Sequence, residues 1–87
     1  MSRKPNQPHA TGRARIKCED SVTKLVVTIT LSRGDEIGFA IGAMNWAGFK
    51  IAIATPSRLT LAPVGRRRLP AVAEALRGAG FRVAGGR

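Results

Sequence analysis

Hydrophobic and polar residues alternate between Lys24 and Leu31, and this period of two predicts a β-strand. One face would carry Leu25, Val27, Ile29 and Leu31, and the other Val26, Thr28 and Thr30. Most of these residues are β-branched, which suits a pleated surface.

Alternation returns in residues 49–63, where two short strands flank Thr55-Pro56-Ser57. Proline fixes φ and serine can bond to the local backbone, so these three residues are typical of a turn. The segment therefore predicts a β-hairpin.

Residues 32–48 fit two structures. As a helix, the segment would begin at Ser32 as the N-cap and end at Gly48, although Gly38 and Gly42 each cost about 0.8–1 kcal/mol inside a helix. As a strand, its alternating apolar residues would follow a hairpin loop. We favour the helix.

The C-terminal part predicts one more helix and one more strand. Apolar residues recur at helical spacing from Pro70 to Arg77, and Gly78 and Gly80 would end that helix. Phe81-Arg82-Val83 then predicts a short strand, and no internal repeat is evident.

These elements predict a small α+β domain in residues 22–87. Residues 1–21 hold Pro5, Pro8, Gly12, five basic residues and few large apolar side chains, so we interpret them as a mobile basic arm that could gain strand structure near Ile16. A core of about 65 residues is only marginally large enough for stability, and a homodimer is expected to help.

Composition leaves little for catalysis. The 87 residues include one His, one Cys and five acidic residues, so we predict no catalytic residue, no metal site, no cofactor and no disulfide. The longest uncharged stretch, residues 37–49, is shorter than the roughly 20 residues of a membrane-spanning helix. With no secretory signal in the sequence, we expect a cytoplasmic, nucleoid-associated protein without a membrane partner.

Net charge is the strongest functional signal. Fifteen Lys and Arg against five Asp and Glu give +10, and eleven of the fifteen are Arg, which suits phosphate and guanine. Arg13, Arg15 and Lys17 alternate and would share one face of an extended arm, while Arg66, Arg67 and Arg68 form the densest cluster. Both groups are candidate nucleic-acid contacts, although such charge also serves solubility.

Aromatic residues bear on the kind of nucleic acid. The chain has Phe39, Trp46, Phe49 and Phe81, and each lies within an apolar segment. We expect them in the core, or for Trp46 in the core or a dimer interface, rather than on a stacking surface, which favours duplex over single-stranded nucleic acid.

The segments VVTITLS, RGDEIGFAIGAMNW and AGFKIAIATPSRLTLAP give a strand, a short helix and a hairpin over residues 25–63. This order resembles the AbrB/MazE-like swapped-hairpin family of bacterial and phage DNA-binding proteins, with Phe49 where that family has Asp and one residue missing before Gly48. The resemblance implies an intertwined homodimer that holds DNA near its N-terminal strands, a region that includes Arg15, Lys17, Lys24 and Arg33.

The function that the sequence favours is duplex-DNA binding by a transcriptional regulator or antitoxin-like factor. One alternative is a phage-type inhibitor or protein-binding module whose basic face docks on an acidic partner or blocks a nucleic-acid channel. An RNA-binding protein is the other alternative.

Overall fold

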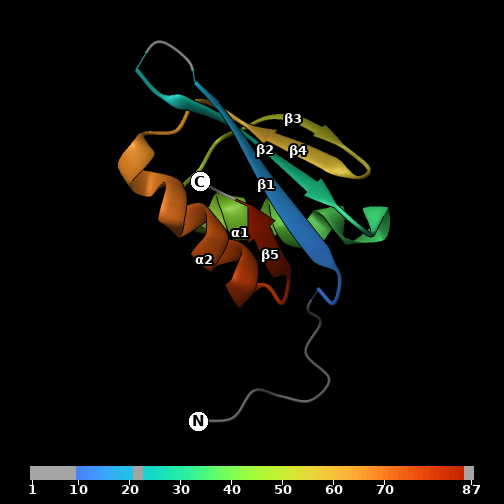
Figure 1. Cartoon of the computed structure of the whole chain (residues 1–87). Coiled ribbons are helices and arrows are strands. Elements are labelled where there is room, and N and C mark those ends of the chain that lie inside the picture. The colour runs from blue at the N-terminus through green and yellow to red at the C-terminus, as the bar shows by residue number, and fades with distance from the viewer. Residues whose placement is uncertain (1–9, 21–22, 86–87) are drawn as a thin grey trace, which may run out of the picture.

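The computed structural model of the protein describes residues 10–20 and 23–85, which form a mixed five-stranded sheet and two helices (Figure 1). The strands are β1 (Arg13–Asp20), β2 (Leu25–Leu31), β3 (Ile51–Thr55), β4 (Arg58–Leu61) and β5 (Arg82–Gly85). The helices are α1 (Ile37–Trp46) and α2 (Leu69–Gly78), and a single 3₁₀ turn precedes each, at Gly34–Glu36 and Arg66–Arg68. The predicted α+β class is confirmed.

The order of the strands in the sheet is β3-β4-β2-β1-β5. Neighbouring strands are antiparallel, except that β5 runs parallel to β1. If β1 is set aside, the chain makes two interleaved units, β2-α1-β3 and β4-α2-β5, which is the split βαβ arrangement. β1 is an additional strand inserted between β2 and β5.

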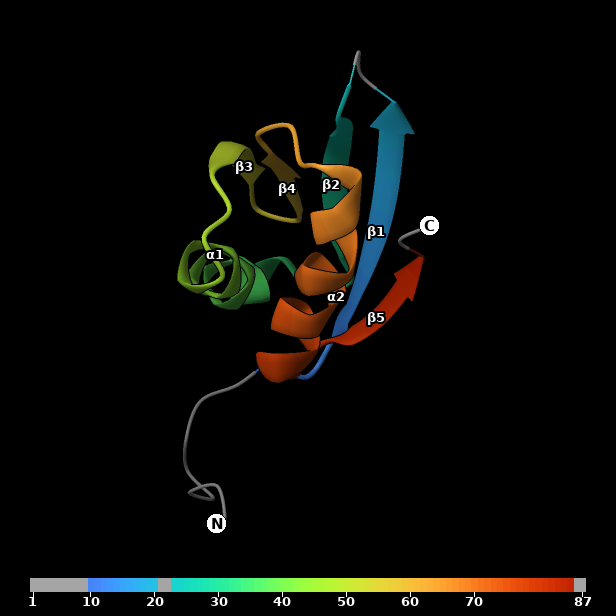
Figure 2. The ribbon, with the colours of Figure 1, turned by 90° about the vertical axis from the view of Figure 1, so that its left-hand side faces the viewer.

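Both helices cover one face of the sheet, and the other face carries no helix (Figure 2). The core lies between the two layers, where the predicted apolar face of β2 is buried against α1 and α2. Its other members include Leu59 and Leu61 of β4, Met44 of α1 and Leu76 of α2. The predicted hairpin, C-terminal helix and final strand are all confirmed, which shows that their local periodicity agrees with the tertiary packing.

Residues 37–46 form a helix, as favoured, but Ser32 is not its N-cap. The Ser32 hydroxyl accepts a hydrogen bond from the Arg13 N–H at 2.8 Å, so it serves the sheet instead of the helix. The helix ends as predicted. Gly48 has φ +89°, and the Phe49 N–H donates to the Met44 carbonyl, which makes a Schellman cap.

The chain contains an internal repeat, so the expectation that it has none is wrong. Adding 32 to the bounds of the first 3₁₀ turn and α1 gives those of the second turn and α2. Both helices end in a Schellman cap, with Gly80 (φ +108°) in the role of Gly48. The two copies of the repeat share most of their identical residues at the helix ends, AGFKIA at 47–52 and AGFRVA at 79–84. The exposed faces of the two helices differ in sequence.

Residues 13–20 are the strand β1 and not part of a mobile arm. Only Ala14 and Ile16 of this strand are buried, so its sequence carries little apolar signal. Residues 10–12 of the predicted arm are described as well, whereas residues 1–9 and 21 lie outside the described residues.

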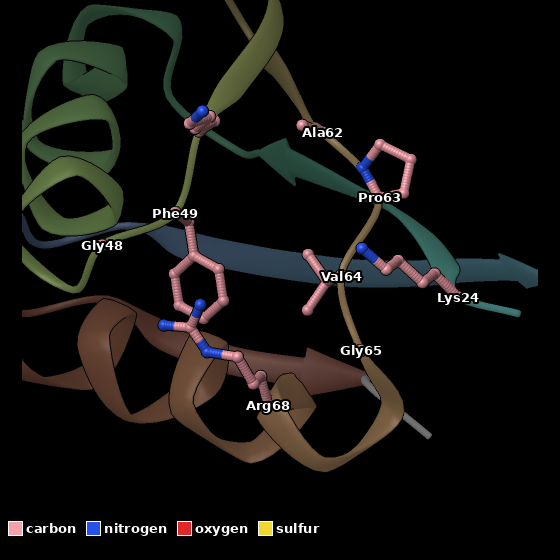
Figure 3. Close-up of a pocket in the computed structure, with 9 residues that line it drawn as sticks. Lys24, Gly48, Phe49, Ala62, Pro63, Val64, Gly65 and Arg68 are labelled. Carbon is pink, nitrogen blue, oxygen red and sulfur yellow. The ribbon is translucent and has the colours of Figure 1, made fainter.

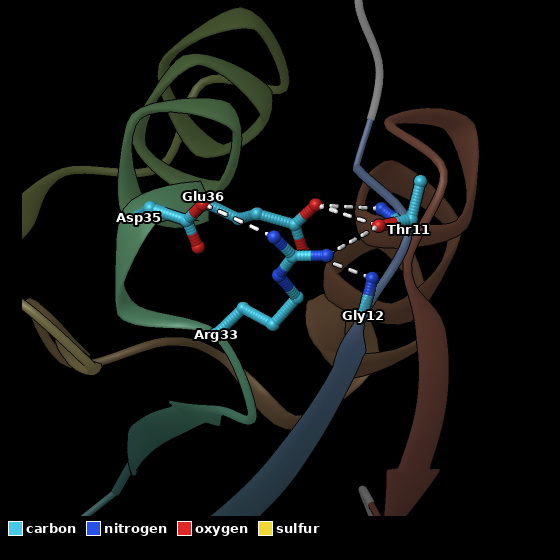
Figure 4. A network of polar contacts seen from close by, with 5 residues as sticks. All are labelled: Thr11, Gly12, Arg33, Asp35 and Glu36. Carbon is cyan, nitrogen blue, oxygen red and sulfur yellow. Dashed lines mark hydrogen bonds and ion pairs between the residues drawn. The ribbon is translucent and has the colours of Figure 1, made fainter.

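The carboxylate of Glu36 holds the chain just before β1 (Figure 4). Glu36 is 5% exposed and accepts hydrogen bonds from the N–H groups of Thr11 and Gly12 at 2.8 and 2.9 Å. Burial acts to raise the pKa of Glu36, but these bonds, the Thr11 hydroxyl and the nearby Arg33 outweigh it and lower the pKa. Glu36 therefore stays ionised and bonded at neutral pH.

Trp46 does not lie in the core, which was one of the two positions expected for it. Phe49 and Phe81 are buried and Phe39 is half-buried, but Trp46 is 90% exposed. It projects from the last turn of α1 because Ala40 and Met44 already define the buried side of that helix.

Candidate functional site

The helix-free face of the sheet gathers basic side chains from three strands. The inward-facing residues Ala14 and Ile16 of β1 and Leu59 and Leu61 of β4 are buried under the helices, and Val83 of β5 is half-buried, so the alternate residues point outward. The cationic sheet face consists of Arg13, Arg15 and Lys17 from β1, Arg58 from β4 and Arg82 from β5. All five are exposed.

Strand register arranges these side chains in rows across the sheet. Arg15 lies opposite Thr30, which lies opposite Arg58, so the two arginines are two strands apart, or about 10 Å. Arg13 lies directly opposite Arg82. From β5 to β4 the cations span about 14 Å, and a shallow depression of about 490 Å³ lies among the cations of β1 and β4.

Threonines lie between the cations on this face. Lys17 is in register with Thr28, and Thr28 with Thr60. Their hydroxyls are neutral donors of the kind that contact phosphate oxygens. The face therefore offers charged and neutral donors in a regular array.

Little negative charge offsets the cationic sheet face. Within residues 10–20 and 23–85, the salt bridges join Arg33 to Asp35, Arg66 to Asp20 and Arg77 to Glu74. None of these pairs uses a cation of the cationic sheet face. Glu19 is the acidic residue on the outward side of β1, at the end away from Arg13.

A second group of cations lines a cavity of about 400 Å³ beside the start of α2 (Figure 3). Lys24, Lys50 and Arg68 contribute the charges. The Arg68 guanidinium lies 4.4 Å from the centre of the Phe49 ring and donates to the Ala47 carbonyl at 3.1 Å. A cation–π contact and a hydrogen bond therefore hold the Arg68 side chain over Phe49 at the edge of the core.

The three-arginine cluster does not present its guanidinium groups together. Arg66 pairs with Asp20 of β1, whereas Arg68 turns toward Phe49. Arg67 is exposed, and the described part of the chain shows no hydrogen bond from its side chain. Arg33 lies apart from these residues, where it contacts Asp35 and the Thr11 hydroxyl (Figure 4).

Arg58, Arg82 and Lys50 are cations that sequence reasoning missed. Arg58 precedes the alternating pair Leu59 and Leu61, so its outward direction was readable from the sequence. The order of the strands in the sheet could not be read from the sequence. Arg82 joins the face only because β5 pairs with β1, far from it in the chain.

Other chemistry is sparse in the described residues. No helix among them is long and apolar enough to cross a membrane. No group of three or more His, Cys, Asp or Glu side chains that could hold a metal ion is found in residues 10–20 and 23–85. Burial raises the pKa of the Cys18 thiol, which disfavours the reactive thiolate.

Comparison with known proteins adds no identity. No family model matches the chain, and neither a curated protein nor a solved structure matches it. The resemblance to AbrB/MazE-like proteins therefore stays a prediction.

Proposed function

We propose that this protein binds duplex nucleic acid, with DNA preferred, through the cationic sheet face. The observation that carries the proposal is a set of five exposed cations on the side of the sheet that no helix covers, none of which forms a salt bridge within residues 10–20 and 23–85. Such a face attracts polyphosphate, and each phosphate that it neutralises releases counterions.

Two features favour a duplex over a single strand. Phe39, Trp46, Phe49 and Phe81 all lie away from this face, so the described residues offer no aromatic ring there on which a base could stack. The cations instead span about 14 Å, similar to the roughly 12 Å major groove of B-DNA, whose flanking phosphates they can reach together. The major groove of A-form RNA is deep and narrow, which favours DNA.

A narrower role as a transcriptional regulator or antitoxin-like factor requires that some side chains read bases. Arginine is suited to this because its planar fork matches the O6 and N7 atoms of guanine. Arg15 and Arg58 lie centrally in the array and are the side chains that we expect to reach base edges.

The test is a set of titrations of the protein with duplex DNA, duplex RNA and their single strands, each at low and moderate salt. We expect the tightest binding to duplex DNA and a steep loss of affinity as salt rises. Equal or tighter binding of single strands would refute the preference for duplexes. No binding of any nucleic acid in dilute buffer would refute the proposal and favour docking on an acidic protein.

A further inference from the structure

The outward side of helix α1 carries no charged residue, and nothing in residues 10–20 and 23–85 covers it. None of its ten residues is charged, and only Ala40 and Met44 are buried. Gly38, Gly42, Asn45 and Trp46 are exposed. A helix that is apolar all round is normally covered on all sides, so this outer face calls for a partner.

The internal repeat shows that the fold does not require an uncharged helix here. The residues of α2 that correspond to Gly42 and Asn45, 32 positions later, are Glu74 and Arg77. Both are exposed and form an ion pair on the helix surface. The absence of charge is therefore a property of α1 alone.

No described residue packs closely against the two exposed glycines of α1. A Cβ atom placed on Gly38 or Gly42 would meet nothing within 4 Å. Each glycine nevertheless weakens the helix relative to alanine. Because no side chain stands at either glycine, the backbone of another helix can approach α1 closely from outside.

We propose that the outer face of α1 pairs with the same face of a second copy of this chain. Gly38, Gly42 and Trp46 are spaced by four and lie on one ridge of the helix. A two-fold axis at Gly42 makes the two helices antiparallel and sets each Trp46 opposite Gly38 of the other copy. The large side chain then fills the space that the missing side chain leaves, and the contact is isologous.

Charge limits where a second copy can dock. The chain carries +10 overall, so two copies repel each other wherever their basic surfaces meet. The α1 face is uncharged and lies on the side of the sheet opposite the cationic sheet face (Figure 2). Two copies can therefore join at α1 while their cationic sheet faces point away from each other.

The pairing has a consequence that rests on the proposed function. A dimer joined through α1 presents two cationic sheet faces in opposite directions, so it binds two duplexes and bridges them. A monomer binds one duplex and bridges none.

Self-association can be followed directly because Trp46 is the single tryptophan of the chain. A contact built on two tryptophans and small residues is at the low end of interface sizes, so dimerisation is expected between about 10 and 500 µM. Over this range, sedimentation should report dimers, and Trp46 fluorescence should shift to the blue and resist acrylamide quenching. High salt should strengthen the association because it screens the charges.

The Gly42→Glu variant should weaken dimerisation about 100-fold, because it places two carboxylates face to face at the two-fold axis. Glutamate has a higher helix propensity than glycine and the position is open, so the monomer should fold, which far-UV circular dichroism verifies. Ala71→Glu, at an exposed position of α2, makes the same change in charge and should leave dimerisation unchanged. Gly42→Ala should weaken dimerisation without any charge, because its methyl group separates the helices.

The proposal is overturned if the wild-type protein stays monomeric over this range, or if it dimerises while Trp46 stays accessible. Shielding of Trp46 only after another macromolecule is added would equally overturn self-association. Bridging is tested separately by capture of a labelled duplex on an immobilised one. Gly42→Glu should bind each duplex but not bridge them, and loss of binding in the wild-type protein itself would instead refute the proposed function.

Discussion

Replacing Arg15 and Arg58 by glutamine removes two of the five charges of the cationic sheet face and keeps most of each side chain. Both residues are exposed, and the described residues form no salt bridge with either, so the fold should tolerate the change. If all five cations contact phosphate, the slope of log affinity against log salt should be about −4.5. The double variant should have a slope of about −2.7.

These slopes give a large difference within an accessible range. Between 50 and 200 mM salt the wild-type protein should lose about 500-fold in affinity, and the double variant about 40-fold. Fluorescence anisotropy with a labelled duplex of about 20 base pairs measures both slopes and also the weaker binding of the variant at low salt.

The matched control is Arg67→Gln/Arg77→Gln. It lowers the net charge from +10 to +8, as the double variant does, but removes exposed arginines from the helix layer. We expect it to keep the wild-type slope. If both variants shift the slope equally, binding depends on net charge alone and the cationic sheet face is not the site.

Three further predictions concern stability and the arginine cluster. Glu36→Gln should lower the free energy of unfolding by about 2 kcal/mol at neutral pH, because a carboxylate that accepts backbone hydrogen bonds is lost. Because the pKa of Glu36 is lowered in the folded state, the stability that its carboxylate contributes is fully present above the ordinary glutamate pKa of about 4.3 and is lost as the pH falls through the folded-state pKa. Urea unfolding should therefore show that the difference in stability between the wild-type protein and Glu36→Gln becomes smaller in acid. Gly48→Ala should lower the free energy of unfolding by about 1–2 kcal/mol because φ is +89° at this position. Gly42→Ala should instead stabilise the monomer by up to about 1 kcal/mol. Equal effects of the two variants in thermal unfolding would contradict the assigned helix end. Replacing residues 66–68 by alanine should weaken duplex binding much less than Arg15→Gln/Arg58→Gln does. A larger loss of affinity in parallel titrations would show that residues 66–68 form the main binding site.

Local patterns predicted most elements of the fold because those patterns describe contacts that the elements make. The alternation in residues 25–31 marks a strand with one face in the core, and helical spacing after Pro70 marks the side of α2 that covers it. β1 was anticipated only as strand structure that the arm could gain near Ile16. Its buried residues include the small Ala14, and Glu36 holds the preceding residues by hydrogen bonds that produce no periodic pattern in the sequence.

The candidate site was only partly predictable because it depends on strand order. Three of its cations, Arg13, Arg15 and Lys17, lie on one strand and were visible as an alternating set. Arg58 and Arg82 reach the same face through β4 and β5, which are separated from β1 in the sequence by one or both helices.

Trp46 shows that sequence patterns also fail to separate core residues from residues of an apolar surface. Its apolar neighbours in the sequence indicated a core position, but a hydrophobic segment reveals only that burial is favourable and not whether the same chain provides it. In α1, Ala40 and Met44 satisfy the core, and Trp46 is left outside. Burial of Trp46 therefore requires a contact between two molecules. The concentration dependence of its fluorescence measures whether such a contact forms.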